Sequence, residues 1–254
     1  MPALFESLSF RRGPAMKNRF MLAPLTNQQS HADGVLSDDE FRWLTMRAEG
    51  GFGLTMTCAA SVQDGGQGFP GQLGAHDDRH IPGLARLASA LRAQETHAVL
   101  QLHHAGMRSP ATLIGRQPLC PSANAETNAR AMTLAEIEQT RDDFIAAARR
   151  CEHAGFDGVQ LHGAHGYLLC QFLSPEINRR DDQYGGSLEN RSRLLFEIID
   201  GVRASCGPNF SLGVRLSPER FGLKLEEIAT VAQRLMREDN IEYLDMSLWD
   251  VFKE

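Results

Sequence analysis

Several features that would mark a special class of protein are missing from this chain. It has no CxxC pair, and its five cysteines are dispersed and odd in number. That spacing argues against a disulfide framework or a cysteine-rich zinc site and indicates reduced thiols. No apolar run approaches the length of a membrane span, and the first residues lack the apolar core of a signal peptide. We therefore expect a soluble, cytoplasmic protein with no membrane partner.

Excess basic charge and internal repeats are also missing. The formal net charge is −6, whereas nucleic-acid binding favours a clustered basic face, so no nucleic-acid partner is expected. The chain shows no low-complexity linker and no short repeat of the kind that predicts a solenoid. With 254 residues, 42% of them hydrophobic, the chain is long enough to bury the core of one α/β barrel domain.

What the sequence does contain is a regular alternation of short β-like runs with helical segments. Thr133 and Glu136 have the spacing of a capping box before a helix that ends near Gly155. Ser187 is a candidate N-cap for the next helix. Such alternation predicts a parallel sheet with right-handed crossovers. The predicted strands span residues 19–25, 53–60, 97–103, 156–162, 210–217 and 241–247.

Four of these strands pair an aliphatic face with a small or polar face, because side chains two residues apart share a face. Gln101, His162 and Arg215 lie on the polar faces, near the C-terminal ends of their strands. A parallel barrel builds its site at that end, so we predict a polar ligand over the barrel mouth. The predicted helix-facing sets are Leu54, Met56 and Cys58; Ala98, Leu100 and Leu102; Val159 and Leu161; and Leu212, Val214 and Leu216.

The number of strands falls short of a closed barrel. The chain stops seven residues after the sixth predicted strand, and a long excursion over residues 104–155 separates the third strand from the fourth. A closed barrel has eight βα units, and its common phosphate site follows strands seven and eight. The expected fold class is α/β, of the (β/α)8 TIM-barrel type, with only about six βα units present in what we interpret as a fragment.

Three segments resemble the Old Yellow Enzyme family of FMN-dependent ene-reductases, also called NADH:flavin oxidoreductases. They are LFESL with KNRFMLAPLT near the start, LQLHHAGMRS at the third strand, and FDGVQLHGAHGYLLCQFLSPEINRRDDQYGGSLENRSRLLFEIIDGVR. The resemblance covers essentially the whole chain. It implies that residues 1–254 form one FMN-binding TIM-barrel domain, incomplete at the C-terminus. It also implies FMN as the ligand over the mouth, with NADH or NADPH as the reductant.

The resemblance further implies which residues hold the flavin. Arg215 would place a cation near the N1/O2 edge of the ring, which favours the anionic reduced flavin. Gln101 would hydrogen-bond the pyrimidine side, and Ala59 would approach the ring by its backbone. The segment along the isoalloxazine would consist of Ala23, Pro24, Leu25 and Thr26, with Thr26 near the ring carbonyl.

The segment HGAHGY, residues 162–167, would carry the substrate chemistry. By resemblance, His162 and His165 would bind the carbonyl or nitro oxygen of an electron-poor alkene, and Tyr167 would protonate its α-carbon. Gly163 and Gly166 would let the backbone turn tightly. The predicted enzyme takes hydride from NAD(P)H and reduces the activated C=C bond of small α,β-unsaturated carbonyl or nitro compounds.

Two other interpretations stay open. A metal-dependent barrel hydrolase would use the same histidines, although HxxH alone lacks the three protein ligands of a catalytic zinc, and we predict no metal. A catalytically silent fragment would lack the common phosphate site. The oligomeric state, a homo-oligomer included, also stays open. We interpret YGGSLENR as structural, with a turn at residues 184–186, and Cys58 and Cys170 as packing thiols.

Overall fold

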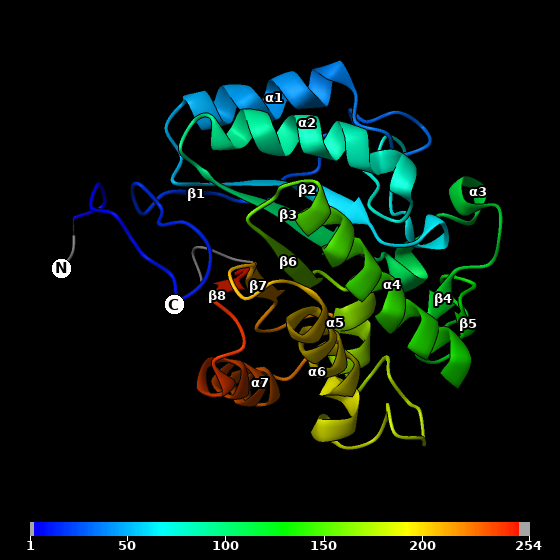
Figure 1. The fold of residues 1–254 in the computed structure, drawn as a ribbon. Helices are drawn as coiled ribbons and strands as arrows, with labels where there is room; N and C mark the ends of the chain where they lie inside the picture. The colour runs from blue at the N-terminus through cyan, green and yellow to red at the C-terminus, as the bar shows by residue number, and fades with distance from the viewer. Residues whose placement is uncertain (1–2, 249–254) are drawn as a thin grey trace.

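A computed structural model describes residues 3–248 (Figure 1). Six strands form one parallel sheet in the order β1-β2-β3-β6-β7-β8, as the alternation predicts. They are β1 (Met21–Leu22), β2 (Leu54–Ser61), β3 (His97–His103), β6 (Gly158–Gly163), β7 (Ser211–Leu216) and β8 (Tyr243–Met246). The main helices are α1 (Asp38–Glu49), α2 (Ile81–Arg92), α4 (Leu134–His153), α5 (Leu168–Leu173), α6 (Leu188–Ser205) and α7 (Leu225–Glu238).

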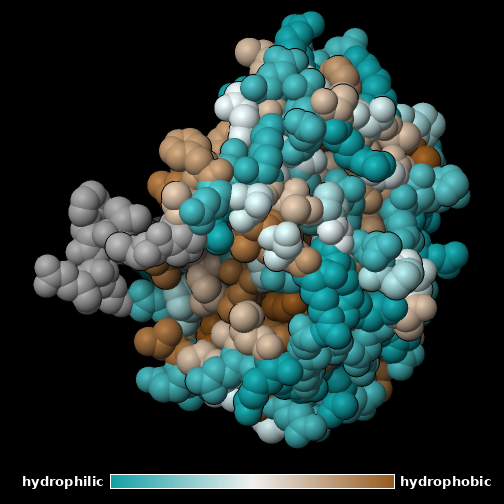
Figure 2. All heavy atoms as spheres, turned by 60° about the vertical axis from the view of Figure 1, so that its left-hand side comes forward, coloured by the Kyte–Doolittle hydropathy of each residue, from teal (hydrophilic) through white to brown (hydrophobic). Residues whose placement is uncertain are grey.

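The helices cover the outside of a curled sheet, with α1 against β2, α2 against β3 and α4 against β6 (Figure 1). No pairing within residues 3–248 joins β1 to β8, so the described sheet is open at these two strands. Figure 2 brings this side forward and shows hydrophobic surface around a hollow. Phe20, before β1, and Met246 and Leu248, at the end of β8, are exposed. None of the described helices is long and apolar enough to cross a membrane.

The segment between β3 and α4 departs most from a regular βα repeat. It contains α3 (Ala111–Ile114) and a small parallel sheet of β4 (Leu119–Cys120) and β5 (Arg130–Ala131). Strands of two residues carry no readable alternation, which is why the sequence did not predict them. The segment ends at Thr133, which forms the predicted capping box with Glu136. This reciprocal cap fixes where α4 begins.

The side-chain alternation predicted for β3, β6 and β7 is confirmed. The aliphatic face of each strand packs beneath the helices in one continuous core, and the opposite face points to the inside of the curled sheet. Burial of these side chains is the main favourable contribution to folding. The buried helix-facing residues are Ala98, Leu100, Leu102, Val159, Leu161, Leu212, Val214 and Leu216.

Strand β2 does not keep the predicted alternation. Leu54 and Met56 belong to an interior cluster with Val99, whereas Cys58 belongs to the core beneath the helices. The prediction that Leu54, Met56 and Cys58 share one face is therefore wrong. The cause is a shift in the pairing register of β2 with β3 between Met56 and Ala59, because an extra residue reverses which face the following side chains occupy.

The YGGSLENR segment forms the predicted turn and helix start. Gly186 has φ +78°, a left-handed conformation that glycine adopts without strain. The side chain of Ser187 accepts a hydrogen bond from the backbone N–H of Asn190, which caps α6.

Candidate active site

Three of the predicted ligand-contacting side chains lie together at the C-terminal ends of the strands. His162 of β6 is in register with Arg215 of β7, and Gln101 of β3 is in register with Gln160 of β6. Gln101 is 1% exposed and His162 is 4% exposed. Paired residues on neighbouring parallel strands share a face, so these side chains all point to the inside of the curled sheet. The structure thus gathers them where a parallel barrel builds its site.

A cluster of four rings stands at this mouth, made of His103, His162, His165 and Tyr167. The centroid of the Tyr167 ring lies 5.0 Å from that of His162 and 6.4 Å from that of His165. The two imidazoles of His162 and His165 are 5.0 Å apart. His103, which is not among the predicted site residues, lies 4.3 Å from Tyr167 and 5.3 Å from His162. We call these four residues the ring cluster.

The backbone after β6 turns sharply to present these rings. His165 has φ +60° and Gly166 has φ +69°, so two successive residues are left-handed. Gly166 therefore fills the predicted turning role, and the His165 conformation is costly for a residue with a side chain. Gly163 does not turn, because it is the last residue of β6. A Cβ there would lie 3.0 Å from the carbonyl oxygen of Arg215, so its role is close strand packing.

The protonation of His162 follows from its hydrogen bonding. The backbone N–H of Ala164 donates to Nδ1 of His162 at 3.3 Å. A nitrogen that accepts cannot carry the proton of a neutral imidazole, so the proton is on Nε2. Burial lowers the pKa of His162 well below its ordinary value, and neighbouring His103 adds to the effect. His162 is therefore a neutral ring with an Nε2–H donor.

His103 is fixed in the same tautomer by Gln72. The Oε1 atom of Gln72 accepts from the backbone N–H of Gly68 at 2.7 Å, and its Nε2 donates to the carbonyl of Ala59 at 2.9 Å. The same Nε2 lies 3.0 Å from Nδ1 of His103, which must therefore accept. The Nε2–H of His103 is buried with no hydrogen-bond partner among residues 3–248.

Two further residues that the sequence did not indicate touch the ring cluster. Ser247 lies just beyond β8, and its Oγ is 2.6 Å from Nε2 of His165 and 3.3 Å from a guanidinium nitrogen of Arg215. The guanidinium of Arg108 lies 4.8 Å from the centroid of the Tyr167 ring and donates to the carbonyl of His165. Both come from segments far from residues 162–167 in sequence, so no local motif could reveal them.

The buried histidines should make the stability of the protein depend on pH. Burial lowers the pKa of both His103 and His104 to about 3. Each ring takes up a proton near pH 6.5 when unfolded but stays neutral when folded, so stability is complete above pH 6.5 and falls as the pH drops toward 3. Well below pH 6.5, each histidine should remove about 1.4 kcal/mol from the unfolding free energy per pH unit.

Urea unfolding at several pH values between 7 and 5 measures this slope. In the variant His104→Gln, the unfolding free energy should change less steeply with pH. The difference should equal the contribution of one histidine, because glutamine has no proton to gain. An unfolding free energy that stays constant over this range would contradict the assignment of neutral buried rings.

The predicted flavin-contacting segment lies at the rim of the mouth. Leu25 is 61% exposed, and Ala23 and Thr26 are also exposed, while Pro24 is half-buried. Ala59 is buried and in register with Gln101, so it faces the inside of the sheet. The exposed Leu25 is an apolar side chain at the rim, and the buried Ala59 adds little side-chain bulk to the inside of the sheet.

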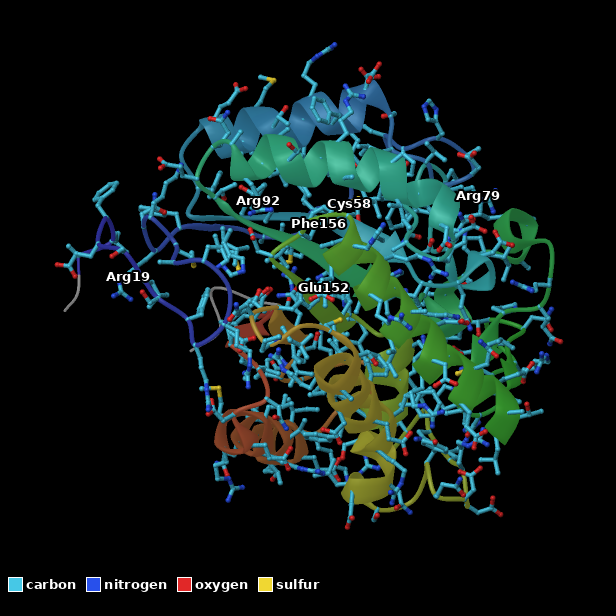
Figure 3. The ribbon with its side chains drawn as sticks, viewed as in Figure 1. Arg19, Cys58, Arg79, Arg92, Glu152 and Phe156 are labelled. Carbon is cyan, nitrogen blue, oxygen red and sulfur yellow. The ribbon has the colours of Figure 1, made fainter. Side chains whose placement is uncertain are left out.

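Glu40 of α1 ties this rim to β2. Its carboxylate accepts hydrogen bonds from Nδ2 of Asn27 at 3.3 Å, from Sγ of Cys58 at 2.7 Å and from the hydroxyl of Ser30. Cys58 lies on the helix side of β2 (Figure 3), and burial raises the pKa of its thiol well above the ordinary value. It is therefore a packing thiol that holds a structural contact, as the sequence predicts.

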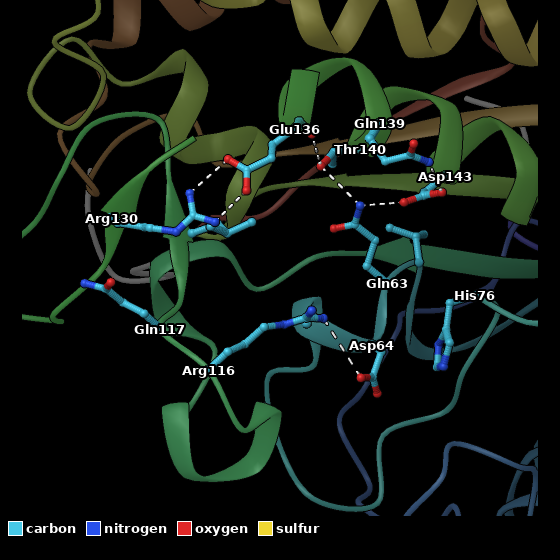
Figure 4. Close-up of a pocket in the computed structure, with 13 residues that line it drawn as sticks. Gln63, Asp64, His76, Arg116, Gln117, Arg130, Glu136, Gln139, Thr140 and Asp143 are labelled. Atoms are coloured by element: carbon cyan, nitrogen blue, oxygen red, sulfur yellow. Dashed lines mark hydrogen bonds and ion pairs between the residues drawn. The ribbon is translucent and has the colours of Figure 1, made fainter. Parts of the chain in front are cut away.

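A separate cavity of about 480 Å³ lies between the segment after β2 and the start of α4 (Figure 4). Arg130 and Glu136 form an ion pair on one wall, and Nε2 of Gln63 donates to Asp143 at 2.5 Å on another. None of the four rings lines this cavity. Within residues 3–248, no group of three or more histidine, cysteine or acidic side chains is placed to hold a metal ion.

Comparison with known proteins identifies relatives along the whole chain. A probable NADH-dependent flavin oxidoreductase of Bacillus subtilis is 39% identical over 259 aligned residues, which cover 98% of this chain and 69% of the relative. The NADH:fumarate oxidoreductase of Klebsiella pneumoniae is 34% identical over 96% of this chain, but the match spans only 28% of that protein. This chain therefore corresponds to a small part of some relatives.

Solved structures agree with this result. The Old Yellow Enzyme homologue from Zymomonas mobilis superposes with a TM-score of 0.90 at 33% identity, covering 98% of this chain and 74% of the other. Morphinone reductase in complex with tetrahydroNAD superposes with a TM-score of 0.86 at 31% identity, covering 97% and 74% of the two chains.

The family model for NADH:flavin oxidoreductases and NADH oxidases matches residues 3–252. FMN is the flavin of these oxidoreductases, and NADH or NADPH is their reductant. Sequence and fold agree over nearly the full length, so this chain belongs to the NADH:flavin oxidoreductase / NADH oxidase family, which includes the Old Yellow Enzymes.

Proposed function

We propose that this chain binds FMN and acts as an ene-reductase, taking hydride from NADH or NADPH and reducing the activated C=C bond of an α,β-unsaturated carbonyl or nitro compound. The observation that carries the proposal is the ring cluster. It sets the neutral imidazoles of His162 and His165 beside the phenol of Tyr167, at the mouth that also holds Gln101 and Arg215. Aligned neutral donors and one acid are what reduction of such an alkene requires.

The residues at the mouth fit FMN. Arg215 brings a guanidinium to the mouth whose Nε is 3.4 Å from the carboxylate of Asp245 without a hydrogen bond within residues 3–248, and Gln101 presents a carboxamide on the neighbouring part of the sheet. The small side chain of Ala59 leaves room for a flat ring, and the exposed Leu25 offers it an apolar edge. Bound FMN would supply the hydride transfer between the nicotinamide and the alkene. The residues proposed to hold it are Ala23, Pro24, Leu25, Thr26, Ala59, Gln101 and Arg215.

His162 and His165 would bind the oxygen of the substrate that becomes more negative during the reaction. Nε2–H of His162 is held as a donor by Ala164. The Ser247 hydroxyl accepts from Arg215 and can therefore donate to Nε2 of His165, which leaves an Nδ1–H donor on that ring for the substrate. Burial lowers the pKa of His165 to about 4, so this ring too is neutral at pH 7. Fixed neutral donors need no reorganisation as charge develops on the oxygen.

Tyr167 would complete the reaction by donating its hydroxyl proton to the α-carbon. Arg108 lies over the Tyr167 ring and bonds the carbonyl of His165, so it holds the phenol and the imidazole in a fixed relation.

A visible absorption spectrum of the purified chain, taken before and after adding FMN and then NADPH under argon, tests the proposal. We expect a bound-flavin spectrum that bleaches with NADPH or NADH and returns on adding an enone. The variant His162→Ala/His165→Ala should stay yellow but recover slowly with the enone, because the substrate oxygen loses both proposed donors. A chain that binds no flavin, or one whose double variant recovers at the original rate, would overturn the proposal.

A further inference from the structure

A row of side chains joined by hydrogen bonds and one ion pair crosses the inside of the sheet beneath the mouth. Nε2 of Gln101 donates to Oε1 of Gln160 at 2.7 Å, and Nε2 of Gln160 donates to Oδ2 of Asp245 at 3.2 Å. The same oxygen lies 3.4 Å from Nε of Arg215. These four residues, which we call the polar row, come from β3, β6, β8 and β7.

Asp245 determines the direction of every hydrogen bond in the polar row. An ionised carboxylate only accepts, so Gln160 must turn its NH2 group toward Asp245 and its carbonyl oxygen toward Gln101. Gln101 must then use its NH2 group on Gln160, which leaves its own Oε1 as the acceptor for a ligand. Without such an anchor, the two ends of each carboxamide would be interchangeable.

Asp245 also offsets the charge of Arg215. Their side chains are 12% and 13% exposed, so water and salt screen this ion pair only partly. The negative charge of Asp245 therefore cancels part of the positive electrostatic potential that Arg215 creates at the mouth. A ligand bound there experiences less positive potential than the guanidinium alone would produce.

We propose that Asp245 is a positioning residue for the flavin, which fixes the carboxamide of Gln101 through Gln160 and moderates the field of Arg215. The inference rests on the proposed function, in which Gln101 and Arg215 face the pyrimidine side of FMN. The N3–H group is the donor on that side of the ring, and it matches the Oε1 acceptor that the polar row leaves on Gln101. Asp245 itself takes no part in the hydride or proton transfers.

The test compares the binding of FMN with that of 3-methyl-FMN, which has no N3–H, by fluorescence titration of the unliganded chain. The original chain should prefer FMN by about tenfold, the equivalent of one good hydrogen bond. In Asp245→Asn the carboxamide of Gln160 can reverse, so this preference should fall to less than threefold. The midpoint potential of the bound flavin should become more positive, because Arg215 is no longer offset and favours the more negative redox state.

The matched control is Asp239→Asn, which makes the same exchange at an exposed position after α7 and should change neither quantity. Gln160→Met, a second variant, cuts the polar row but keeps both charges, so it should lose the preference for FMN while the potential stays constant. If Asp245→Asn and Gln160→Met keep both the preference and the potential of the original chain, the inference is wrong and the proposed function stands. If the original chain binds neither flavin, both fail.

Discussion

Replacing Tyr167 with phenylalanine is expected to slow the reduction of an enone by about 10²- to 10⁴-fold. The change removes the proposed proton donor but keeps the ring, so the contacts with His103 at 4.3 Å and His162 at 5.0 Å persist. The Arg108 guanidinium, 4.8 Å from the ring centroid, also keeps its partner. The loss should therefore be confined to the step that needs the hydroxyl hydrogen, and NADPH should bleach the flavin at the original rate.

Rapid mixing separates the two half-reactions, since bleaching by NADPH under argon and recovery with an enone are recorded independently. Tyr184→Phe is the matched control: its hydroxyl donates to Glu197 at 2.9 Å, and Tyr184 is not part of the ring cluster. We expect this control to leave both half-reactions unchanged. Equal slowing of bleaching and recovery in Tyr167→Phe would mean that the phenol holds the site together and is not the acid.

Arg191→Met is expected to lower the free energy of unfolding by about 3–5 kcal/mol. The Arg191 side chain is 3% exposed and forms two hydrogen bonds with Glu227 of α7, at 2.9 and 3.0 Å. It also donates to the carbonyl of Leu173, at the end of α5, at 2.6 Å and to the carbonyl of Gly186, in the turn before α6, at 3.1 Å. Methionine fills much of the space but leaves these acceptors without their donor.

Urea unfolding followed by circular dichroism measures this cost. Arg193→Met lies two residues along the same helix, where the half-buried arginine bonds the carbonyl of Gln183 and the side chain of Asn190. This control should cost less than about 1 kcal/mol, because its acceptors stay close to water. Equal costs for the two variants would show that Arg191 does not lock α5, α6 and α7 together.

The arginine also explains why YGGSLENR is a compact structural unit. The two glycines allow the turn, Ser187 caps α6, and Arg191 projects from the first turns of the helix to bond the carbonyl of Gly186. The sequence predicts the turn and the cap because both are local. It does not predict the ion pair with Glu227, which lies 36 residues further along the chain.

The sequence by itself determined the order of strands and helices and, for β3, β6 and β7, which side chains face the helices. These features depend on the spacing of residues within one element, where the periods of strand and helix are fixed by geometry. The same holds for His162, His165 and Tyr167, which one turn after β6 brings together. Their family roles came from resemblance and stay predictions.

Only the tertiary structure decided the features that depend on neighbouring segments. The bulge in β2, which places Cys58 on the opposite face from Leu54 and Met56, arises from pairing with β3. His103 reaches the mouth from the end of β3, whereas Asp245 and Ser247 reach it from β8 and the residue just beyond that strand. Contacts of this kind join residues far apart in the chain, and their existence depends on the register between strands. A single sequence does not encode that register in any local pattern.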